Sequence, residues 1–492
     1  MSTTALPSGT KRYEALATLV ERQIDRGMLR PGDRLPSVRQ TCIAHSVSPS
    51  TVFQAYYLLE GRGRIRAVPR SGYYVTARPD GKLLPEPATS RPKSGPRTCD
   101  VNDFVFEILA TVRAPGIVPL GSALPAAALF PLERLRRALV TGARRLTPAA
   151  MVADLPPGNL ALKREIARRY VQYGIALAPD EIVLTHGAIE ALHLCLQAVT
   201  RPGDAVVVES PTFYVALQAL QRLGLRAIEV PTHVRDGIDL ARLAEVLDLY
   251  KPQAIWLTTT FQNPLGSLMP NDKKRELVAL LARHQVPLIE DDVYGELYEG
   301  PIAPMPAKAF DGAGLVLHCS SFSKCLAPGY RVGWAAPGRW THQVERLKLM
   351  TSLSGSIPVQ AAIAQYLHEG GFDRHLRTLR ERLRAQRDRM FDAVNRKFPP
   401  GTLTVRPAGG YFVWVELPVS VDAVKLHRLA LADQISIAPG PMFSARGEFR
   451  HHVRLSCGQP WDRSQEKALD TLARLAREAM AGSTDTVPHT TG

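Results

Sequence analysis

An alternation of short apolar runs with helical stretches, between residues 181 and 320, most constrains the fold of this chain. The runs EIVLTH, AVVVES, AIWLTT, PLIEDD and GLVLHCS are separated by helical patterns such as AIEALHLCLQAV and KKRELVALLARH. Strands that alternate with helices form a mostly parallel sheet flanked by helices. The sequence therefore predicts an α/β region, and ligands are expected beyond the carboxyl ends of its strands.

Polar or aromatic residues follow several of these expected strands. Gly187 to Ile189 open a helix directly after EIVLTH, where backbone N–H groups can bind a phosphate. The other candidates are Phe213, Asn263, Asp291, Tyr294 and Arg454. Taken singly, each has a plainer explanation, such as a core aromatic ring or an Asn-Pro turn. The Asp-Asp pair at 291–292 also suggests a metal, but no histidine or third carboxylate is placed to complete that set.

The stretch CSSFSKCLAPGYRVGW, residues 319–334, contains the lysine best suited to chemistry. Lys324 lies between two serines and Arg331, directly after the apolar run GLVLH. The hydroxyl groups of Ser321 and Ser323 and the guanidinium of Arg331 can bind phosphate oxygens, and a Pro-Gly pair bends the chain back toward the lysine. A solvated surface lysine is the alternative when this stretch is considered alone.

Together these residues supply the groups that pyridoxal 5'-phosphate requires. Lys324 provides an amine for the aldehyde, and Asp291 provides an acid that keeps the ring nitrogen protonated. Asn263 and Tyr294 provide donors to the phenolic oxygen, and Phe213 provides a ring that stacks on the cofactor. The expected phosphate ligands are Ala188, Ile189, Ser321, Ser323 and Arg331.

The N-terminal part of the chain predicts a winged helix-turn-helix over residues 11–76. A first helix is expected over Tyr13 to Gly27, a second begins at the N-cap Ser37, and a third extends from Ser50 to Glu60. The runs IRAV and GYYV are expected strands, which are joined by a turn. Such modules place the start of the third helix against double-stranded DNA.

The charge of this module supports DNA as its partner. The chain carries a formal net charge of +15, and residues 11–76 contain eleven Lys or Arg against five Asp or Glu, a net charge of +6. A basic surface favours polyanions. Arginines flank the second helix and line the wing: Arg34, Arg39, Arg62, Arg64, Arg66 and Arg70. The alternative is that they only solvate a small domain or dock a protein.

Composition predicts a multidomain cytosolic protein. A chain of 492 residues is long enough for about three domains. No N-terminal segment joins a basic region to an apolar core, and the longest charge-free run, residues 349–368, is rich in Ser, Gln and Gly, so no membrane span is expected. The six scattered cysteines predict reduced thiols rather than disulfides or a zinc site.

A proline-rich segment at 77–99 is expected to be a semi-extended tether rather than a packed element. After it, residues 100–482 are expected to form one body, with a large part at about 150–345 and a small part from 100–149 and 346–482. Within the small part, residues 371–397 predict an Arg-dense helix. Its charge is explained either by a solvated face, partly compensated along the helix by Glu381 and Asp388, or by contact with the DNA backbone.

Two resemblances extend this interpretation. The segments PGDRLPSVR, SPSTVFQAYYLLEGRGRI and RSGYYV resemble the GntR-family DNA-binding domain over about the first 76 residues. That resemblance implies DNA contacts by Arg34, Arg39, Ser50, Thr51 and Gly72. One departure is Pro49, because many members of the family carry there an arginine that reads bases.

The second resemblance covers about residues 100–480. SSFSKCLAPGYRVGW, FQNPLGS and EDDVY, in the order found here, resemble fold-type I aminotransferases. The resemblance implies that Lys324 binds the cofactor covalently and that Arg454 grips the α-carboxylate of an amino acid. A winged helix fused to such a body is similar to the MocR subfamily of GntR regulators. This implies a head-to-tail, domain-swapped homodimer in which a bound amino acid or vitamer alters how DNA is held.

The chain departs from the aminotransferase pattern at two positions. Ala153 stands where a tyrosine usually reaches the cofactor phosphate of the partner subunit, and Ala188 replaces a frequent serine. The loss of these hydroxyl donors is expected to weaken cofactor binding.

The sequence as a whole predicts a cytosolic transcriptional regulator with a pyridoxal-phosphate effector domain that senses an amino acid or a related amine or vitamer. An active aminotransferase with a secondary DNA-binding module is the alternative, since a complete site permits both. A body that has lost its cofactor and only dimerises is disfavoured, because Lys324, Asp291, Asn263, Tyr294 and Arg331 are all present.

Overall fold

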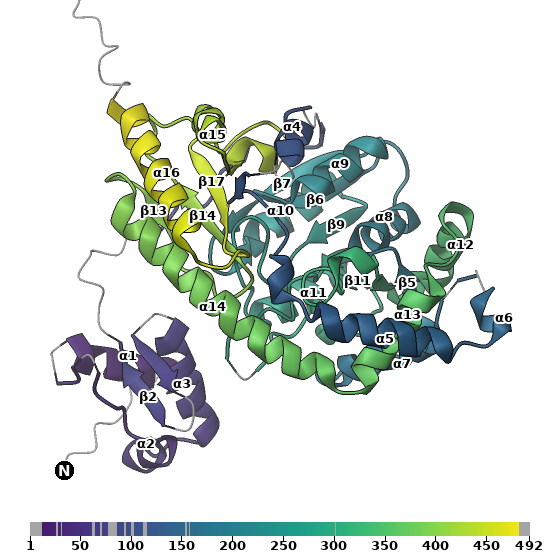
Figure 1. Ribbon diagram of the computed structural model, residues 1–492, viewed down its shortest axis with the longest axis horizontal. Coiled ribbons are helices and arrows are strands. Elements are labelled where there is room, and N and C mark those ends of the chain that lie inside the picture. The colour runs from purple at the N-terminus through teal and green to yellow at the C-terminus, as the bar shows by residue number, and fades with distance from the viewer. Residues whose placement is uncertain are drawn as a thin grey trace, which may run out of the picture. The chain divides into compact units, whose positions relative to one another are not determined.

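A computed structural model describes residues 12–481, apart from residues 26–27, 31, 62–63, 69–70, 77–85, 93–94, 100–102, 112–115, 153–154, 157 and 301. The chain divides into two compact units, residues 1–83 and 84–492, and each is described by itself (Figure 1). Among the described residues, no helix combines the length and the apolar character that crossing a membrane requires.

The N-terminal unit has the helices and the wing that the sequence predicts. Its elements are α1 (Arg12–Asp25), α2 (Val38–His45), α3 (Pro49–Gly61), β1 (Ile65–Val68) and β2 (Gly72–Val75), and the two strands pair antiparallel. A capping box of Ser37 and Gln40 starts α2. Tyr56 of α3 joins helices to wing, because its ring packs edge-on against Tyr73, with 4.9 Å between centroids, and its hydroxyl lies 2.8 Å from the Thr41 hydroxyl.

The C-terminal unit is built on a central sheet with the order β3-β7-β6-β9-β10-β11-β12-β5, and β8 pairs with β7. The strands are β3 (Arg97–Thr98), β5 (Val183–Thr185), β6 (Ala205–Ser210), β7 (Arg226–His233), β8 (Gly237–Ile238), β9 (Ala254–Leu257), β10 (Leu288–Asp291), β11 (Val316–Ser321) and β12 (Gly333–Ala336). Strands β7, β6, β9, β10 and β11 run parallel to one another, whereas β3 and β12 pair antiparallel to their neighbours. The prediction of a mostly parallel sheet is confirmed.

Helices cover both faces of this sheet. Val206 and Val208 of β6 belong to one buried cluster, whereas Val207 belongs to another, as expected for alternate residues of a strand that is buried on both sides. The helices that alternate with these strands are α7 (Leu160–Val171), α8 (Ala188–Val199), α9 (Tyr214–Arg222), α10 (Leu240–Tyr250) and α11 (Asn271–His284).

A smaller sheet has the order β13-β14-β17-β16 and presents Arg454 from β17. Its strands are β13 (Leu403–Thr404), β14 (Phe412–Glu416), β16 (Ala438–Pro439) and β17 (His452–Ser456), and β4 (Val118–Pro119) separately pairs with β15 (Ile435–Ser436). The remaining α-helices of this unit are α4 (Asp103–Thr111), α5 (Leu132–Arg144), α6 (Pro148–Met151), α12 (Thr341–Thr351), α13 (Ile357–His368), α14 (Gly371–Lys397), α15 (Ala423–Ala432) and α16 (Arg463–Ala481).

The segment expected to be an unpacked tether is partly folded onto the C-terminal unit. Its strand β3 pairs antiparallel with β7, and Pro87 and Cys99 are buried. Glu86 forms an ion pair with Arg235, and the Ser90 hydroxyl donates to the Ser210 carbonyl at 2.5 Å. The expectation is therefore wrong for residues 86–92 and 95–99, because a few specific contacts outweigh the proline-rich composition. Residues 77–85 lie outside the described part.

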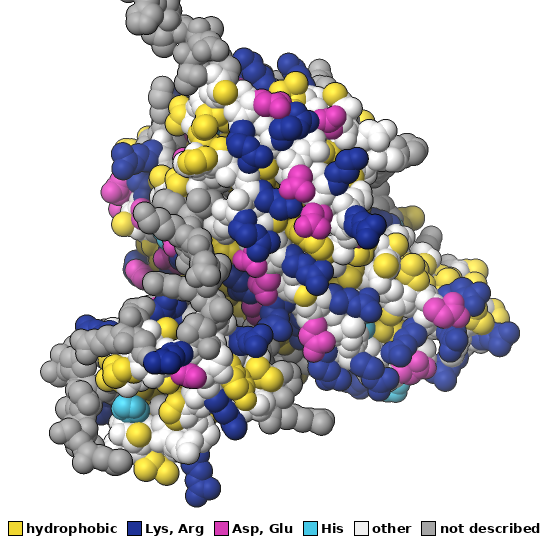
Figure 2. All heavy atoms as spheres, turned by 60° about the vertical axis from the view of Figure 1, so that its left-hand side comes forward, with side chains coloured by type: hydrophobic (Ala, Val, Ile, Leu, Met, Phe, Trp, Pro, Cys, Tyr) yellow, Lys and Arg dark blue, Asp and Glu magenta, His cyan; other side chains and the backbone are white. Residues whose placement is uncertain are grey.

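Helix α14 is rich in arginine, but Arg380 and Arg387 face inward. They pair with Glu296 and Glu299 respectively, and Arg387 is only 1% exposed. Asp388, which was expected to pair along the helix, binds Arg406 of the following segment at 2.6 Å. The exposed arginines of α14 are Arg374, Arg377, Arg382, Arg384, Arg389 and Arg396. Figure 2 shows Lys and Arg side chains spread over the C-terminal unit, with Asp and Glu side chains between them.

Candidate functional site

Lys324 lies just past the end of β11, at the carboxyl edge of the parallel strands. Its amine donates to the carbonyl oxygen of Ala123 at 2.8 Å. Burial and then the charge of Arg454 lower the pKa of Lys324 to about 8, although Asp291 opposes this shift. An appreciable share of this amine is therefore neutral near pH 7.5, and the neutral amine is the form that attacks a carbonyl carbon.

Asp291 ends β10, the strand beside β11, and is 3% exposed. Burial and then the neighbouring Asp292 raise the pKa of Asp291 to about 7. Its Oδ1 atom is buried and has no hydrogen-bond partner among the described residues. An unpaired buried polar group costs about 1–3 kcal/mol of folding free energy, so this site is suited to a ligand that brings its own N–H donor.

Arg454 stands at the centre of a buried polar network. Its guanidinium donates to Oδ1 of Asn263 at 2.7 Å and to the carbonyl of Gly121 at 2.6 Å. Phe412 and Phe443 lie over the guanidinium, with ring centroids 4.3 and 5.2 Å from Cζ. The Nε atom is buried without a partner in the described part of the chain. Arg454 therefore has the fork geometry and the spare donor that a carboxylate requires.

Asn263 and Tyr294 come together as the sequence predicts. Asn263 follows β9, and its side-chain amide nitrogen lies 3.5 Å from the Tyr294 hydroxyl. Both residues are buried, and the Tyr294 ring packs edge-on against Tyr411 and Phe412. The amide of Asn263 thus connects Arg454 to the Tyr294 hydroxyl. Asn263 and Tyr294 are the two donors that the sequence analysis expects at the phenolic oxygen.

Arg331 is turned back toward the start of α8 by a left-handed backbone conformation, with φ of 52°. Its guanidinium donates to the Ser323 hydroxyl at 3.3 Å and to the His186 carbonyl at 3.0 Å. Glycine is required at position 187, because a Cβ there would lie 2.5 Å from the Arg331 side chain and the backbone has φ of 91°. Arg331, Ser323 and the N-terminus of α8 therefore form one cradle.

The same cradle includes Ser321, Ala188 and Ile189. The Ser321 hydroxyl accepts from the backbone N–H of Ser323 at 3.3 Å. Ala188 and Ile189 open α8 directly after its N-cap, where N–H groups have no partner within a helix and the helix dipole is positive. All five predicted phosphate ligands therefore lie in the short segments that form this cradle.

Two further sequence predictions have different outcomes. Phe213 is half-buried directly after β6, and its ring lies edge-on to Tyr214, with 4.7 Å between centroids. No contact fixes its position relative to Lys324, so its stacking on a cofactor stays a prediction. Ala153 lies outside the described residues.

This donor set fits pyridoxal phosphate. The unpaired Oδ1 of Asp291 matches a protonated ring nitrogen, the cradle around Gly187 matches a phosphate, and the amine of Lys324 matches an aldehyde.

Sequence reasoning missed Tyr411 and the segment 121–123, which cover the site. The Tyr411 hydroxyl donates at 2.7 Å to the Ala123 carbonyl, the same atom that accepts from Lys324. Ala123 lies 201 residues before Lys324 in the chain, and no motif marks it. Only the small residues of GSA hint at a close approach of backbone.

The sequence places no histidine or third carboxylate to complete a metal set with the Asp-Asp pair, but one histidine lies close to it in the structure. His318 of β11 lies beside Asp292, with 3.1 Å between Nε2 and Oδ2. The parallel register of β10 and β11 brings together these residues, which are far apart in sequence. No group of three or more His, Cys, Asp or Glu side chains that could hold a metal ion was found among the described residues.

The N-terminal unit presents most of the predicted DNA contacts. Arg39 is exposed on α2, and the Arg34 side chain lies against Gly72 of the wing, where a Cβ would be 3.3 Å from Nε. The Ser48 hydroxyl accepts from the backbone N–H of Thr51 at 3.2 Å and lies 2.9 Å from the Thr51 hydroxyl at the start of α3. The side chains of Ser50, Arg62 and Arg70 lie outside the described part.

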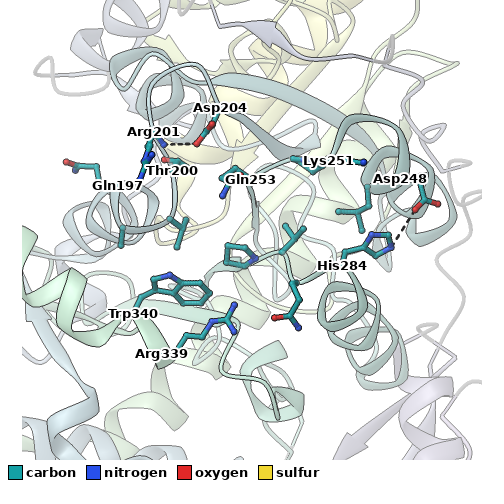
Figure 3. A pocket seen from close by; sticks show the side chains of 17 residues that line it. Gln197, Thr200, Arg201, Asp204, Asp248, Lys251, Gln253, His284, Arg339 and Trp340 are labelled. Atoms are coloured by element: carbon teal, nitrogen blue, oxygen red, sulfur yellow. Dashed lines mark hydrogen bonds and ion pairs between the residues drawn. The ribbon is translucent and has the colours of Figure 1, made fainter.

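A separate hollow of about 990 Å³ lies at the amino edge of the sheet, where β6, β9 and β10 begin (Figure 3). Its walls include the C-terminal ends of α8, α10 and α11, whose negative partial charge accounts for the nearby cations. These cations include Arg201, Lys251 and Arg339. None of its lining residues contributes a buried polar side-chain atom that lacks a partner, so the chemistry belongs to the carboxyl edge.

Comparison with known families agrees with this geometry. Residues 131–470 match the family model of aminotransferase class I and II, and residues 12–75 match that of bacterial regulatory proteins of the gntR family. The chain belongs to the class I and II aminotransferase family. It is a member that carries a GntR winged helix before the aminotransferase domain, which confirms both resemblances and is consistent with the MocR subfamily.

Individual relatives of this GntR-linked aminotransferase-family protein include regulators and enzymes. The HTH-type transcriptional regulator YdcR of Escherichia coli K12 is 46% identical, over 96% of this chain and 100% of YdcR. The multiple substrate aminotransferase of Thermococcus profundus is 28% identical, with a TM-score of 0.73 over 77% of this chain and 96% of that enzyme. LysN, the α-aminoadipate aminotransferase of Thermus thermophilus, complexed with N-(5'-phosphopyridoxyl)-L-leucine, is 29% identical, with a TM-score of 0.69 over 77% of this chain and 98% of LysN.

Proposed function

We propose that this protein is a DNA-binding transcriptional regulator whose C-terminal unit holds pyridoxal phosphate on Lys324 and senses an amino acid or a related amine or vitamer. The observation that carries this proposal is a buried site, in one chain with a GntR winged helix, in which Oδ1 of Asp291 has no hydrogen-bond partner among the described residues and Lys324 lies nearby. The similarity to a transcriptional regulator along its whole length supports regulation rather than metabolism as the main task.

Each residue of the site has a distinct role toward the cofactor. When bound, pyridoxal phosphate supplies an aldehyde and an electron-withdrawing ring. Lys324 offers the amine that holds the aldehyde carbon covalently, and Asp291 accepts the ring N–H. Asn263 and Tyr294 donate to the phenolic oxygen, which leaves the ring in one orientation. The cradle at Arg331 and α8 anchors the phosphate through charge-assisted hydrogen bonds.

Arg454 is the proposed receptor for the effector's α-carboxylate. Its guanidinium now donates to the Gly121 carbonyl, and a carboxylate would replace this neutral acceptor with a charged one, which forms the stronger bond. The neighbouring Ala123 carbonyl accepts from both Lys324 and Tyr411. A carboxylate that binds Arg454 would therefore alter the contacts of segment 121–123, which also accepts the hydrogen bond from Lys324.

The state of assembly and the location are also proposals. Apolar side chains that are about half to four-fifths exposed lie at and after α6: Met151, Val152, Leu155 and Leu160. Exposed apolar groups so close in sequence favour contact with a second copy of the chain. We infer a homodimer, and a regulator that binds double-stranded DNA is expected to act in the cytoplasm.

Absorption spectroscopy and DNA binding test the proposal together. The wild-type protein, reconstituted with pyridoxal phosphate, is expected to show a visible absorption band that survives gel filtration, and Lys324→Ala is expected to lose it. Amino acids are then screened for a change in this band, and any hit is added to a DNA-binding assay. A wild type that stays colourless contradicts the cofactor assignment, and a hit that never alters DNA affinity contradicts the sensor assignment.

Active transamination is the second candidate, and the completeness of the site favours it. Asp291 and Arg454 are buried and Lys324 is half-buried, and the solved structures similar to this chain include aminotransferases. Product formation from an amino donor and a keto acid decides between the two. Many rapid turnovers per protein would support the enzyme, whereas slow or absent turnover with intact spectral changes supports the regulator.

A further inference from the structure

A buried chain of polar side chains lies behind Asp291. Nε1 of Trp334 donates to the Tyr170 hydroxyl at 3.0 Å, this hydroxyl lies 2.7 Å from Nδ1 of His318, and Nε2 of His318 lies 3.1 Å from Oδ2 of Asp292. The directions are mutually consistent when Nδ1 accepts the tyrosine proton and Nε2–H donates to the carboxylate. This relay therefore connects α7 and β12 to the residue next to Asp291.

Asp291 is the middle residue of three consecutive acids, and the outer two are clamped. The Glu290 carboxylate accepts from the Thr259 hydroxyl and from the backbone N–H groups of Ala307 and Lys308, at 2.6 to 3.0 Å. The backbone of Asp292 bonds to Cys319 and Ser320 of β11, both at 2.8 Å. The Asp291 carboxyl group, whose buried Oδ1 is expected to accept from the cofactor, therefore lies between two residues that are held in place.

Asp292 itself is tightly enclosed. Gly295 lies against its carboxylate, since a Cβ there would be 2.6 Å from Oδ1. A cavity of about 30 Å³ is lined by Tyr170, Asp292, His318 and Ser320, among others, and this volume is enough for one water molecule. His318 and Gly295 hold the Asp292 carboxylate through Oδ2 and through packing, whereas its Oδ1 has no hydrogen-bond partner among the described residues. Burial raises the pKa of Asp292 above its usual value, and the hydrogen bond with His318 opposes this shift.

We propose that Asp292 and His318 are positioning residues that place a fixed negative charge behind Asp291, so that Asp291 keeps the proton on the cofactor's ring nitrogen to higher pH. A like charge on the neighbouring residue increases the affinity of a carboxylate, and of a base that shares its proton, for that proton. The histidine is needed because a buried carboxylate without a donor takes up a proton itself. The proposal rests on the proposed function, since it requires a bound cofactor.

Other charged or titratable groups also face Asp291, Asp292 or the relay. They are Glu209, Glu290, Lys274, Lys324, Cys319, Cys325, Tyr173, Tyr294, Arg169 and Glu296. Arg169 and Glu296 pair with each other, and Lys274 donates to the Thr260 hydroxyl and to the Met305 carbonyl. Because these partners are unchanged in variants of Asp292 or His318, a shift in such variants reports the relay.

The test follows the ring nitrogen directly. The full-length protein is loaded with pyridoxal phosphate labelled with ¹⁵N in the ring, and the nitrogen chemical shift is recorded between pH 5.5 and 9.5. In Asp292→Asn the midpoint of deprotonation is expected to fall by about one pH unit, a roughly tenfold loss of proton affinity. His318→Leu is expected to move it in the same direction, and His318→Gln, which keeps an N–H donor, to restore part of the shift.

A matched histidine control is His342→Asn, since His342 lies on α12 with its side chain 94% exposed; its midpoint is expected to equal that of the wild type. Bound label with an unchanged midpoint in Asp292→Asn overturns the relay but leaves the cofactor assignment standing. Absence of bound label in the wild type counts against the proposed function instead. If Asp292→Asn does not fold, wild-type midpoints in both His318 variants overturn the relay.

Discussion

The carboxyl group of Asp291 has opposite effects on folding and on binding. Burial raises its pKa to about 7, whereas in an unfolded chain an aspartate ionises near pH 3.9. Between about pH 4 and 7 the unfolded state has therefore lost a proton that the folded state keeps. The free energy of unfolding falls as pH rises through this window and stays reduced above it.

Replacement of Asp291 by asparagine is expected to stabilise the cofactor-free protein at pH 8. The gain is expected to be at least about 1 kcal/mol, because the ionisation cost of a group shifted by several pKa units disappears. Urea unfolding at pH 8 and pH 5 measures it, and the gain is expected to be smaller at pH 5. The same variant is expected to release pyridoxal phosphate during gel filtration. A less stable Asp291→Asn at pH 8 would contradict the pKa shift.

For single residues of the site, the sequence predicts those that directly follow a strand of the parallel sheet. It misses those that reach the site from distant segments. Asn263, Asp291 and Lys324 each follow a strand of a parallel sheet, so the fold alone brings them to one edge. Gly121 and Tyr411 reach the same place from other parts of the chain. Their contacts depend on tertiary packing, which leaves no periodic pattern in the sequence.

Among the elements, β3 shows how the segment before the C-terminal unit is held. Arg97 pairs with Ala227 and Thr98 with Arg226, and Cys99 directly after the strand is 5% exposed. Burial raises the pKa of the Cys99 thiol to about 12. The thiol is therefore protected from reaction with electrophiles both by the packing around it and because it remains protonated. The thiol is thus a reporter for detachment of β3.

Thr98→Pro is expected to detach β3 from β7, because proline provides no backbone N–H and is poorly accommodated in a strand pair. The reaction of Cys99 with a maleimide is then expected to accelerate by about tenfold or more, the effect of losing about one strand-pairing interaction. The measurement is made in a Cys42→Ala background, since Cys42 is partly exposed. Arg91→Ala, at an exposed residue, is the control, and equal rates in both variants would show that β3 does not protect the thiol.

The elements that the sequence predicts well are those with a repeated pattern. The strands and helices of the α/β region and the N-cap at Ser37 follow from periodicity and from cap chemistry. A strand of two residues such as β3 has no such pattern. In α14, Arg380 and Arg387 turn inward because Glu296 and Glu299 lie against that face, and a count of charges along the helix cannot reveal partners on another segment.

For the molecule as a whole, charge and module order carry the functional assignment. The net charge of +15 favours polyanions in general, and the winged helix provides the part of the surface expected to read DNA. The site at the carboxyl edge of the sheet is the part expected to bind the small-molecule ligand. The segment before the C-terminal unit is anchored at Ser90 to Ser210 and at residues 97–98 to β7. We expect a change at the proposed effector site to reach the winged helix through this segment.

Salt dependence of DNA binding tests the assignment of the N-terminal unit. Arg39 is exposed on α2, and Arg39→Ala is expected to remove one contact with a DNA phosphate. The slope of log affinity against log salt is then expected to fall by about one, and binding is expected to weaken for all DNA sequences alike. Arg22→Ala, at an exposed arginine of α1, is the matched control and is expected to keep the wild-type slope. Both variants are expected to retain the visible absorption of the loaded protein. An unchanged slope in Arg39→Ala would place the DNA contacts elsewhere on the molecule.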